Sequence, residues 1–136
     1  MTIAVYELTD KGPLAKDFGL RDQMRRAAVS VCSNIAEGNE RNTDRDTIRF
    51  LYIAKGSVAE LIAQSDIALG VGYLNVEECK NLTQAGGEIA RMLGGFNKIS
   101  RERGMTQIHT FLTNLPFSPT SRLVPSASRL APGQNV

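Results

Sequence analysis

The feature that most constrains this chain is a long apolar stretch at residues 48–69. Fourteen of its 22 residues are apolar: Ile48, Phe50, Leu51, Tyr52, Ile53, Ala54, Val58, Ala59, Leu61, Ile62, Ala63, Ile67, Ala68 and Leu69. A helix with one buried stripe has fewer apolar positions, so this pattern indicates a helix that is buried on more than one side. In a chain of 136 residues, such a helix is expected at the centre of a helical domain or at a subunit interface.

Helical periodicity extends over most of the first 104 residues, where strand alternation is absent. Before the apolar stretch, apolar residues recur at spacings of three and four, which places them on one face of a helix. After it, the apolar spacing resembles the seam of a helical bundle. The pattern predicts an all-α fold, with helices at residues 2–9, 19–37, 43–69 and 76–103.

Residues that begin and end helices separate these segments. Gly38 follows the second helix at the position where a left-handed cap is usual. Thr43 with Asp46, and Asn75 with Glu78, predict capping-box starts for the third and fourth helices.

Large apolar residues and glycines make further predictions about packing. Leu51, Leu61 and Leu93, together with Phe96, are expected in the core or at an interface. The last helix also contains two pairs of adjacent glycines, and each glycine costs about 1 kcal/mol relative to Ala. Two roles remain open for them, namely close approach of a neighbouring helix or local softening.

Composition excludes several classes of protein. Charged residues interrupt every apolar run, and the N-terminus lacks the features of a secretory signal, so neither a membrane protein nor an exported one is expected. Cys32 and Cys79 are expected to sit among apolar residues, which predicts inert core thiols and a cytoplasmic location. With His109 as its one histidine, the chain is not expected to hold a metal or a cofactor, or to be an enzyme.

The C-terminal part has a different composition. Residues 1–104 hold 14 basic and 14 acidic residues, whereas residues 105–136 hold two arginines, no acidic residue and four of the five prolines. Such a segment buries too little apolar surface to offset its ordering entropy. We expect a helical domain at residues 1–104, a frayed transition at 105–115 and a disordered tail at 116–136.

Three blocks of the sequence resemble a known family. They read GLRDQMRRAAVSVCSNIAEGNER at residues 19–41, FLYIAKGSVAELIAQSDIALGVGY at residues 50–73 and EIARMLGGFNKI at residues 88–99. The pairing of SNIAEG with GS-x-x-EL at residues 56–61 is the most specific part. Over residues 18–103 the chain resembles the four helix bundle proteins, also called the 23S rRNA intervening-sequence protein family.

The resemblance implies an antiparallel up-down four-helix bundle that assembles into a ring, typically a homopentamer. Members of the family are small bacterial proteins, and many are encoded within insertions in rRNA genes. Relatives act as accessory proteins of diversity-generating retroelements and bind nucleic acid and a reverse transcriptase. No enzymatic activity is attached to the family.

The first helix of the family is normally longer than the one expected here. Either the start codon lies upstream, or this copy is truncated. Truncation would expose apolar surface on the other three helices.

One candidate site lies at the end of the second helix. Asn34, Glu37 and Arg41 follow one another at spacings of three and four. If Glu37 were a general acid or base in paired-carboxylate chemistry, it would need a second carboxylate across a cleft, and no spacing identifies one. We expect instead that Asn34 and Glu37 bond to backbone or arginine groups and fix the turn into the third helix.

A second candidate site interrupts the apolar surface of the third helix at Gly56, Ser57 and Glu60. With Arg49 and Gln64, Gly56 and Glu60 form a narrow polar stripe. A glycine and serine in the middle of a helix offer no free N–H groups, which argues against phosphate binding. A subunit contact is expected, in which small residues allow close approach and Glu60 meets a basic partner.

Clusters of basic residues are the one indication of nucleic-acid binding. Phosphate binding needs such clusters rather than a high net charge, but a solvated, salt-bridged helix surface remains the alternative. The candidates are Arg21, Arg25, Arg26, Arg41, Arg45, Arg49, Arg91 and Lys98. No aromatic residue is expected to be interleaved with those of the second and third helices, which predicts little sequence preference.

These observations together predict a non-enzymatic, homo-oligomeric bundle that acts as an RNA or ribonucleoprotein accessory factor. The alternative is a protein-binding scaffold, for example a partner of a reverse transcriptase.

Overall fold

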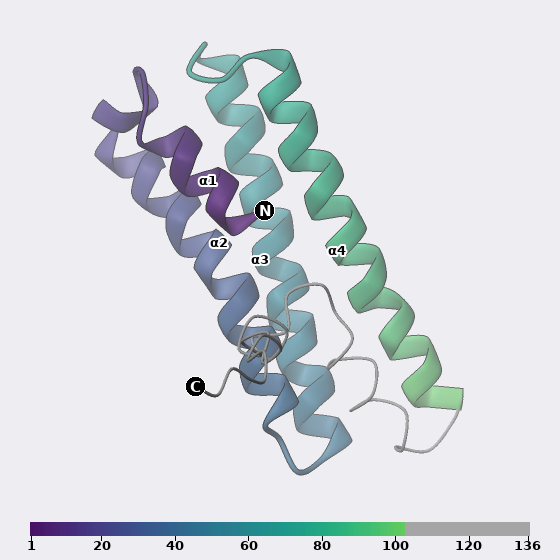
Figure 1. The fold of residues 1–136 in the computed structure, drawn as a ribbon. Coiled ribbons are helices and arrows are strands. Elements are labelled where there is room, and N and C mark those ends of the chain that lie inside the picture. Colours follow the sequence, from purple (N-terminus) through teal and green to yellow (C-terminus); the bar gives the residue numbers. More distant parts are fainter. Residues whose placement is uncertain (103–136) are drawn as a thin grey trace, which may run out of the picture. The chain divides into compact units, whose positions relative to one another are not determined.

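A computed structural model shows the architecture of the chain (Figure 1). It describes the backbone of residues 1–102 and the side chains of residues 1–96. Within this part the regular elements are four α-helices and one 3-10 turn, without strands, which confirms the all-α class. The helices are α1 (Thr2–Thr9), α2 (Phe18–Asn39), α3 (Asp44–Gly70) and α4 (Val76–Glu102). The predicted domain boundary at residue 104 and the predicted frayed and disordered segments, 105–115 and 116–136, lie outside the described residues.

Helix α3 is the central element of the bundle. It packs against α2 on one side and against α4 on the other, while the short α1 packs on α2 (Figure 1). Short turns join α2 to α3 and α3 to α4, so these three helices alternate in direction. This placement confirms that the apolar stretch forms a helix buried on more than one side. Among the described helices, none is long and apolar enough to cross a membrane.

Capping boxes fix the starts of α3 and α4, as predicted. The hydroxyl Oγ1 of Thr43 accepts a hydrogen bond from the backbone N–H of Asp46 at 3.2 Å. At α4, Asn75 Oδ1 accepts from the backbone N–H of Glu78, and the Glu78 carboxylate accepts from the Asn75 N–H, both at 2.9 Å. The box at α4 satisfies two backbone donors, whereas at α3 the Asp46 carboxylate accepts from the Thr43 hydroxyl at 2.7 Å and one backbone donor is satisfied.

The prediction of a left-handed cap at Gly38 is wrong. Helix α2 continues through this residue to Asn39. The residue that caps the helix is Glu40, which has a φ of −86° and is therefore not left-handed. A Cβ at Gly38 would lie 3.1 Å from Cβ of Phe50 and 3.3 Å from the carbonyl oxygen of Thr47. The missing side chain therefore allows the end of α2 to lie close to the start of α3.

The predicted core residues are buried. Leu51 and Leu61 are each 1% exposed, Leu93 is 4% exposed and Phe96 is 5% exposed. A single cluster joins residues from all four helices and the turns between them: Val5, Leu14, Met24, Ala27, Ala28, Leu61, Ala68, Leu74 and Leu82.

The prediction of core thiols holds for one cysteine only. Cys79 is buried, whereas Cys32 is exposed on α2. Helix α1 has only two turns, and Thr2 at its start contacts α2. The Thr2 hydroxyl lies 3.1 Å from the Ala28 carbonyl oxygen and 3.1 Å from Cys32 Sγ. Cys32 thus lies at the edge of the region that α1 covers.

Candidate nucleic-acid interface

Arg25, one of the predicted phosphate-binding residues, joins α1 to α2. Its Nε donates to Thr9 Oγ1 at 2.8 Å, and its guanidinium forms an ion pair with Asp10 at 3.0 Å. The same group lies 4.8 Å from the centre of the Tyr6 ring. These contacts hold the end of α1 on α2, so Arg25 has a structural role.

Arg21 is also engaged within the bundle. Its Nη1 donates to the carbonyl oxygen of Ala15 at 3.1 Å, which ties α2 to the turn that precedes it. It pairs with Asp22 at 3.1 Å and lies 4.6 Å from the centre of the Phe18 ring.

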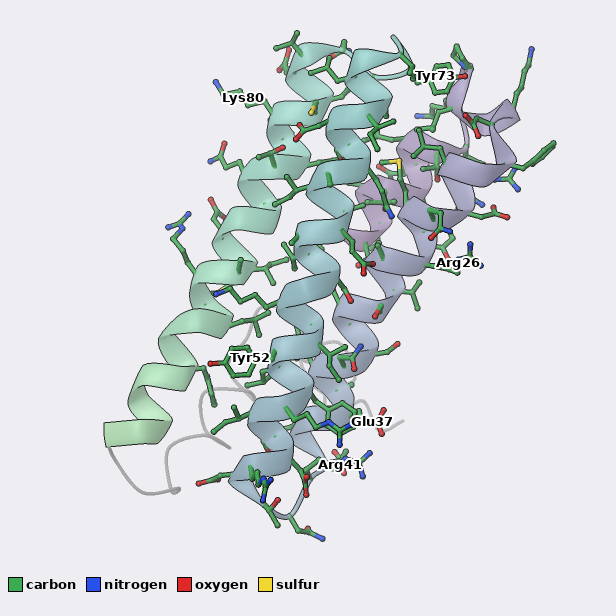
Figure 2. All side chains as sticks on the ribbon, turned by 180° about the vertical axis from the view of Figure 1, so that it is seen from behind. Arg26, Glu37, Arg41, Tyr52, Tyr73 and Lys80 are labelled. Carbon is green, nitrogen blue, oxygen red and sulfur yellow. The ribbon has the colours of Figure 1, made fainter. Side chains whose placement is uncertain are left out.

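The first candidate site forms local contacts at the turn between α2 and α3. Arg41 forms an ion pair with Glu37 and lies 4.6 Å from the centre of the Phe50 ring on α3. The amide of Asn34 donates to the carbonyl oxygen of Ser30 at 2.8 Å. Figure 2 shows Glu37 and Arg41 together at this end of the bundle. Glu37 and Arg41 thus stabilise the turn, whereas Asn34 bonds within α2, so the expectation that Asn34 fixes the turn is wrong.

The first two of the three sequence blocks that carry the family resemblance meet through a hydroxyl pair. The Oγ atoms of Ser30 on α2 and Ser57 on α3 are 2.8 Å apart, and Asn34 donates to Ser30 Oγ at 3.0 Å. Ser57 is 6% exposed, so this polar contact lies between the two helices. Gly56 and Glu60, in contrast, are exposed, and a Cβ at Gly56 would meet no atom within 4 Å.

The other predicted basic residues have exposed side chains, except for Lys98, whose side chain lies outside those described. Within the described residues, these exposed arginines make no ion pair: Arg26, Arg45, Arg49 and Arg91. Arg26 projects from the middle of α2 (Figure 2). Arg45 and Arg49 follow each other by one turn on α3 and therefore share a face.

Lys55 adds a cation that the sequence analysis missed. It is exposed, and its Nζ lies 3.8 Å from the position that a Cβ would take at Gly94 on α4. Arg91 precedes Gly94 by three residues and so lies on the same side of α4. Because α3 and α4 are antiparallel, the first half of α3 and the second half of α4 lie side by side. We call this group the α3/α4 basic surface: Arg45, Arg49, Lys55 and Arg91.

Acidic residues gather at the other end of the same pair of helices. Asp66 lies in the last turns of α3, and Glu77 and Glu78 lie in the first turn of α4. Near the basic surface, Asp44 and Asp46 occupy the first turn of α3, where they complement the helix dipole. The charge is therefore polarised along the α3/α4 pair.

Tyr52 lies within the α3/α4 basic surface. It follows Arg49 by three residues, precedes Lys55 by three and is 50% exposed. Figure 2 shows it projecting from α3 on the side of α4. The expectation of a basic surface without aromatic residues is thus wrong. Tyr52 belongs to the apolar stretch that predicts a core helix. The sequence pattern therefore predicts that Tyr52 is buried.

Beyond Tyr52, the exposed face of α3 continues with small apolar residues and an isoleucine. Ile67 is 55% exposed, and exposed small residues precede it at spacings of four, four and three. We call this group the α3 apolar stripe: Gly56, Ala59, Ala63 and Ile67. Residues at these spacings share one face of a helix, and the exposed Glu60, four residues after Gly56 and seven before Ile67, lies on that face as well.

The described residues contain no group of three His, Cys, Asp or Glu side chains that is arranged to hold a metal ion. Burial raises the pKa of the Cys79 thiol, and a hydrogen bond to Asp66 at 3.5 Å raises it further. Glu37 has an arginine as its ion-pair partner. Besides carboxylates and the Cys32 thiol, the described surface exposes cations without ion-pair partners, the Tyr52 ring and the α3 apolar stripe.

Comparisons with known proteins identify the family. The fold is similar to a solved structure from Bacteroides thetaiotaomicron, a protein of unknown function from the S23 ribosomal protein family. The two structures match with a TM-score of 0.62 and 21% sequence identity, and the match covers 76% of this chain and 89% of that chain. At this identity the likeness shows the fold. None of the curated proteins matches the chain. The sequence model of the 23S rRNA-intervening sequence protein family matches residues 1–95, and because this match spans most of the sequence, the chain belongs to that family.

Proposed function

We propose that this protein is a non-enzymatic, homo-oligomeric helical bundle that binds nucleic acid in the bacterial cytoplasm as an RNA or ribonucleoprotein accessory factor. The observation that carries the proposal is the α3/α4 basic surface. Its four side chains are exposed, and none has an ion-pair partner within the described residues. Clustered cations without partners attract phosphates through a field that salt screens.

The proposed surface is narrower than the set of basic residues that the sequence predicts. Arg21, Arg25 and Arg41 each form an ion pair and stack on an aromatic ring. A phosphate would have to compete with these internal contacts. Arg45 and Arg49 have no such competitor among the described residues and are the residues to test.

Assembly is the second part of the proposal. The α3 apolar stripe combines an exposed isoleucine with small residues, which let another helix approach closely, and exposed apolar patches mark interfaces. Family resemblance suggests a pentamer. A ring would repeat the basic surface and multiply a weak contact with an extended RNA. The same stripe also supports the alternative of a protein-binding scaffold, for example for a reverse transcriptase.

Binding is tested by fluorescence anisotropy with a labelled single-stranded RNA. Four phosphate contacts on one subunit predict a loss of about 50-fold in affinity between about 50 and 200 mM salt. The variant Arg45→Glu/Arg49→Glu should bind at least about tenfold more weakly. The control is Lys11→Glu/Lys16→Glu, which reverses the same amount of charge at exposed residues before α2. If the wild type does not bind at low salt, or if both variants lose affinity equally, the proposal fails and the scaffold alternative replaces it.

Assembly is tested by size-exclusion chromatography with light scattering. The wild type should have a mass that is a multiple of the 14.8 kDa subunit. Ile67→Glu places a charge in the stripe and should reduce the mass without loss of helicity. Val76→Glu is a matched control, because Val76 is 72% exposed and lies outside the stripe. A monomeric wild type would contradict this part of the proposal.

A further inference from the structure

The aromatic rings on the surface differ in what covers them. Three rings each have an arginine guanidinium of the same chain within 5 Å of the ring centre: Tyr6 with Arg25 at 4.8 Å, Phe18 with Arg21 at 4.6 Å and Phe50 with Arg41 at 4.6 Å. Tyr73 packs against the core cluster. Tyr52 is half exposed, and within the described residues no guanidinium lies over its ring. Its face is therefore available to a ligand.

The neighbours of Tyr52 are suited to a phosphate backbone. Arg49 and Lys55 lie three residues before and after it, so the three side chains form one ridge across the helix. The six residues between the two cations correspond to roughly 9 Å along the helix axis. Gly94 carries no side chain beside Lys55, which leaves the ammonium group free of a bulky neighbour on α4.

A cation on each side of an open ring is an arrangement that suits an unpaired base. Single-strand binding combines cations that follow the backbone with aromatic faces on which bases stack. A duplex keeps its bases stacked on one another, so an isolated tyrosine adds little to duplex binding. We propose that an unpaired base stacks on Tyr52 while Arg49 and Lys55 hold adjacent phosphates, and that the ligand of this surface is single-stranded nucleic acid. This inference rests on the proposed function and names its ligand class.

The first test compares a single-stranded RNA with a duplex of the same length. Removal of one stacked base contact weakens binding by about fivefold to 150-fold, so Tyr52→Ala should lose this much affinity for the single strand and less than about twofold for the duplex. Tyr52→Phe keeps an aromatic face and should bind the single strand as the wild type does. Because Tyr52 is half exposed, circular dichroism should show both variants folded.

The second test is spectroscopic. The chain contains no tryptophan, so Tyr52→Trp introduces one reporter within the basic surface. Stacking of a base should quench its fluorescence when single-stranded RNA is added. Tyr73→Trp places the same reporter after the other end of α3 (Figure 2) and should show no quenching.

The outcomes separate this inference from the proposed function. If Arg45→Glu/Arg49→Glu abolishes binding but Tyr52→Ala binds the single strand as the wild type does, the proposed function stands and the stacking inference is overturned. Equal losses of single-strand and duplex affinity in Tyr52→Ala also overturn it. If the wild type binds neither RNA at low salt, the proposed function fails, and the inference fails with it.

Discussion

Gly86 controls how closely α3 and α4 approach, and its replacement by alanine tests the packing of the bundle. A Cβ at residue 86 would lie 3.2 Å from Val58 Cγ1 and 3.2 Å from Ile62 Cδ1, both on α3. These distances are shorter than an ordinary van der Waals contact. The adjacent Gly87 is a matched control in the same turn of α4, since a Cβ there would meet no atom within 4 Å.

The two substitutions should have different effects on stability. Alanine is favoured over glycine in a helix by about 0.5–1 kcal/mol, and Gly87→Ala should stabilise the protein by this amount. Gly86→Ala gains the same helix propensity but overpacks the contact with α3, which costs about 1–3 kcal/mol. The net change for Gly86→Ala is then between no effect and a loss of about 2.5 kcal/mol, so the two variants should differ by about 1–3 kcal/mol.

The measurement is urea unfolding followed by far-UV circular dichroism. Wild type and both variants are compared at one protein concentration, because the stability of an oligomer depends on concentration. The denaturation midpoint should fall or stay constant for Gly86→Ala and rise for Gly87→Ala, with an unchanged m-value. If Gly86→Ala is as stable as Gly87→Ala, α3 and α4 do not hold residue 86 against Val58 and Ile62 at this distance.

Three further predictions concern other parts of the bundle. Leu61→Ala should cost about 2–5 kcal/mol, because Leu61 is 1% exposed; a loss below about 0.5 kcal/mol in chemical denaturation would show that this side chain is not in the core. Arg25→Ala should cost about 1–2 kcal/mol through its lost contacts with α1, whereas Arg26→Ala should stay within about 0.5 kcal/mol, and equal losses would contradict the role of Arg25. An alkylating reagent should modify Cys32 well before Cys79. Cys79 is buried away from the reagent, and its raised thiol pKa keeps the thiolate fraction low as the pH increases. Peptide mapping by mass spectrometry measures both rates, and equal rates would contradict this reasoning.

Local signals account for the part of the fold that the sequence predicts well. The capping boxes at Thr43 and Asn75 involve residues three apart, so their outcome depends little on the rest of the chain. The apolar density at residues 48–69 likewise predicts the central helix without knowledge of its neighbours. Gly38 marks the limit of such signals, because the same glycine is compatible with a helix cap and with close packing against α3. Only the neighbouring helix decides between the two.

Tertiary contacts decide the parts of the site that the sequence does not predict. Arg21 and Arg25 are spaced as a cationic pair on one helix face, but the docking of α1 and its turn engages both. Conversely, Lys55 and Tyr52 lie inside an apolar stretch that suggests burial. Their exposure depends on which sides of α3 the other helices cover.

Under the proposed function, α3 would serve both assembly and RNA binding, and the two groups of residues lie at different places along it. Arg45 and Arg49 lie in its first half, whereas Ile67 lies about five turns beyond Arg49, so a contact centred on Ile67 would leave these two arginines exposed. An assembly-deficient Ile67→Glu variant should therefore bind a short single strand, which reaches one subunit, within about twofold of the wild type. A long RNA that contacts several subunits should lose about 10²-fold or more in affinity, because the multivalent contribution is gone. If the variant also loses the short strand in an anisotropy titration, the RNA site spans the subunit interface and the two surfaces of α3 are not independent.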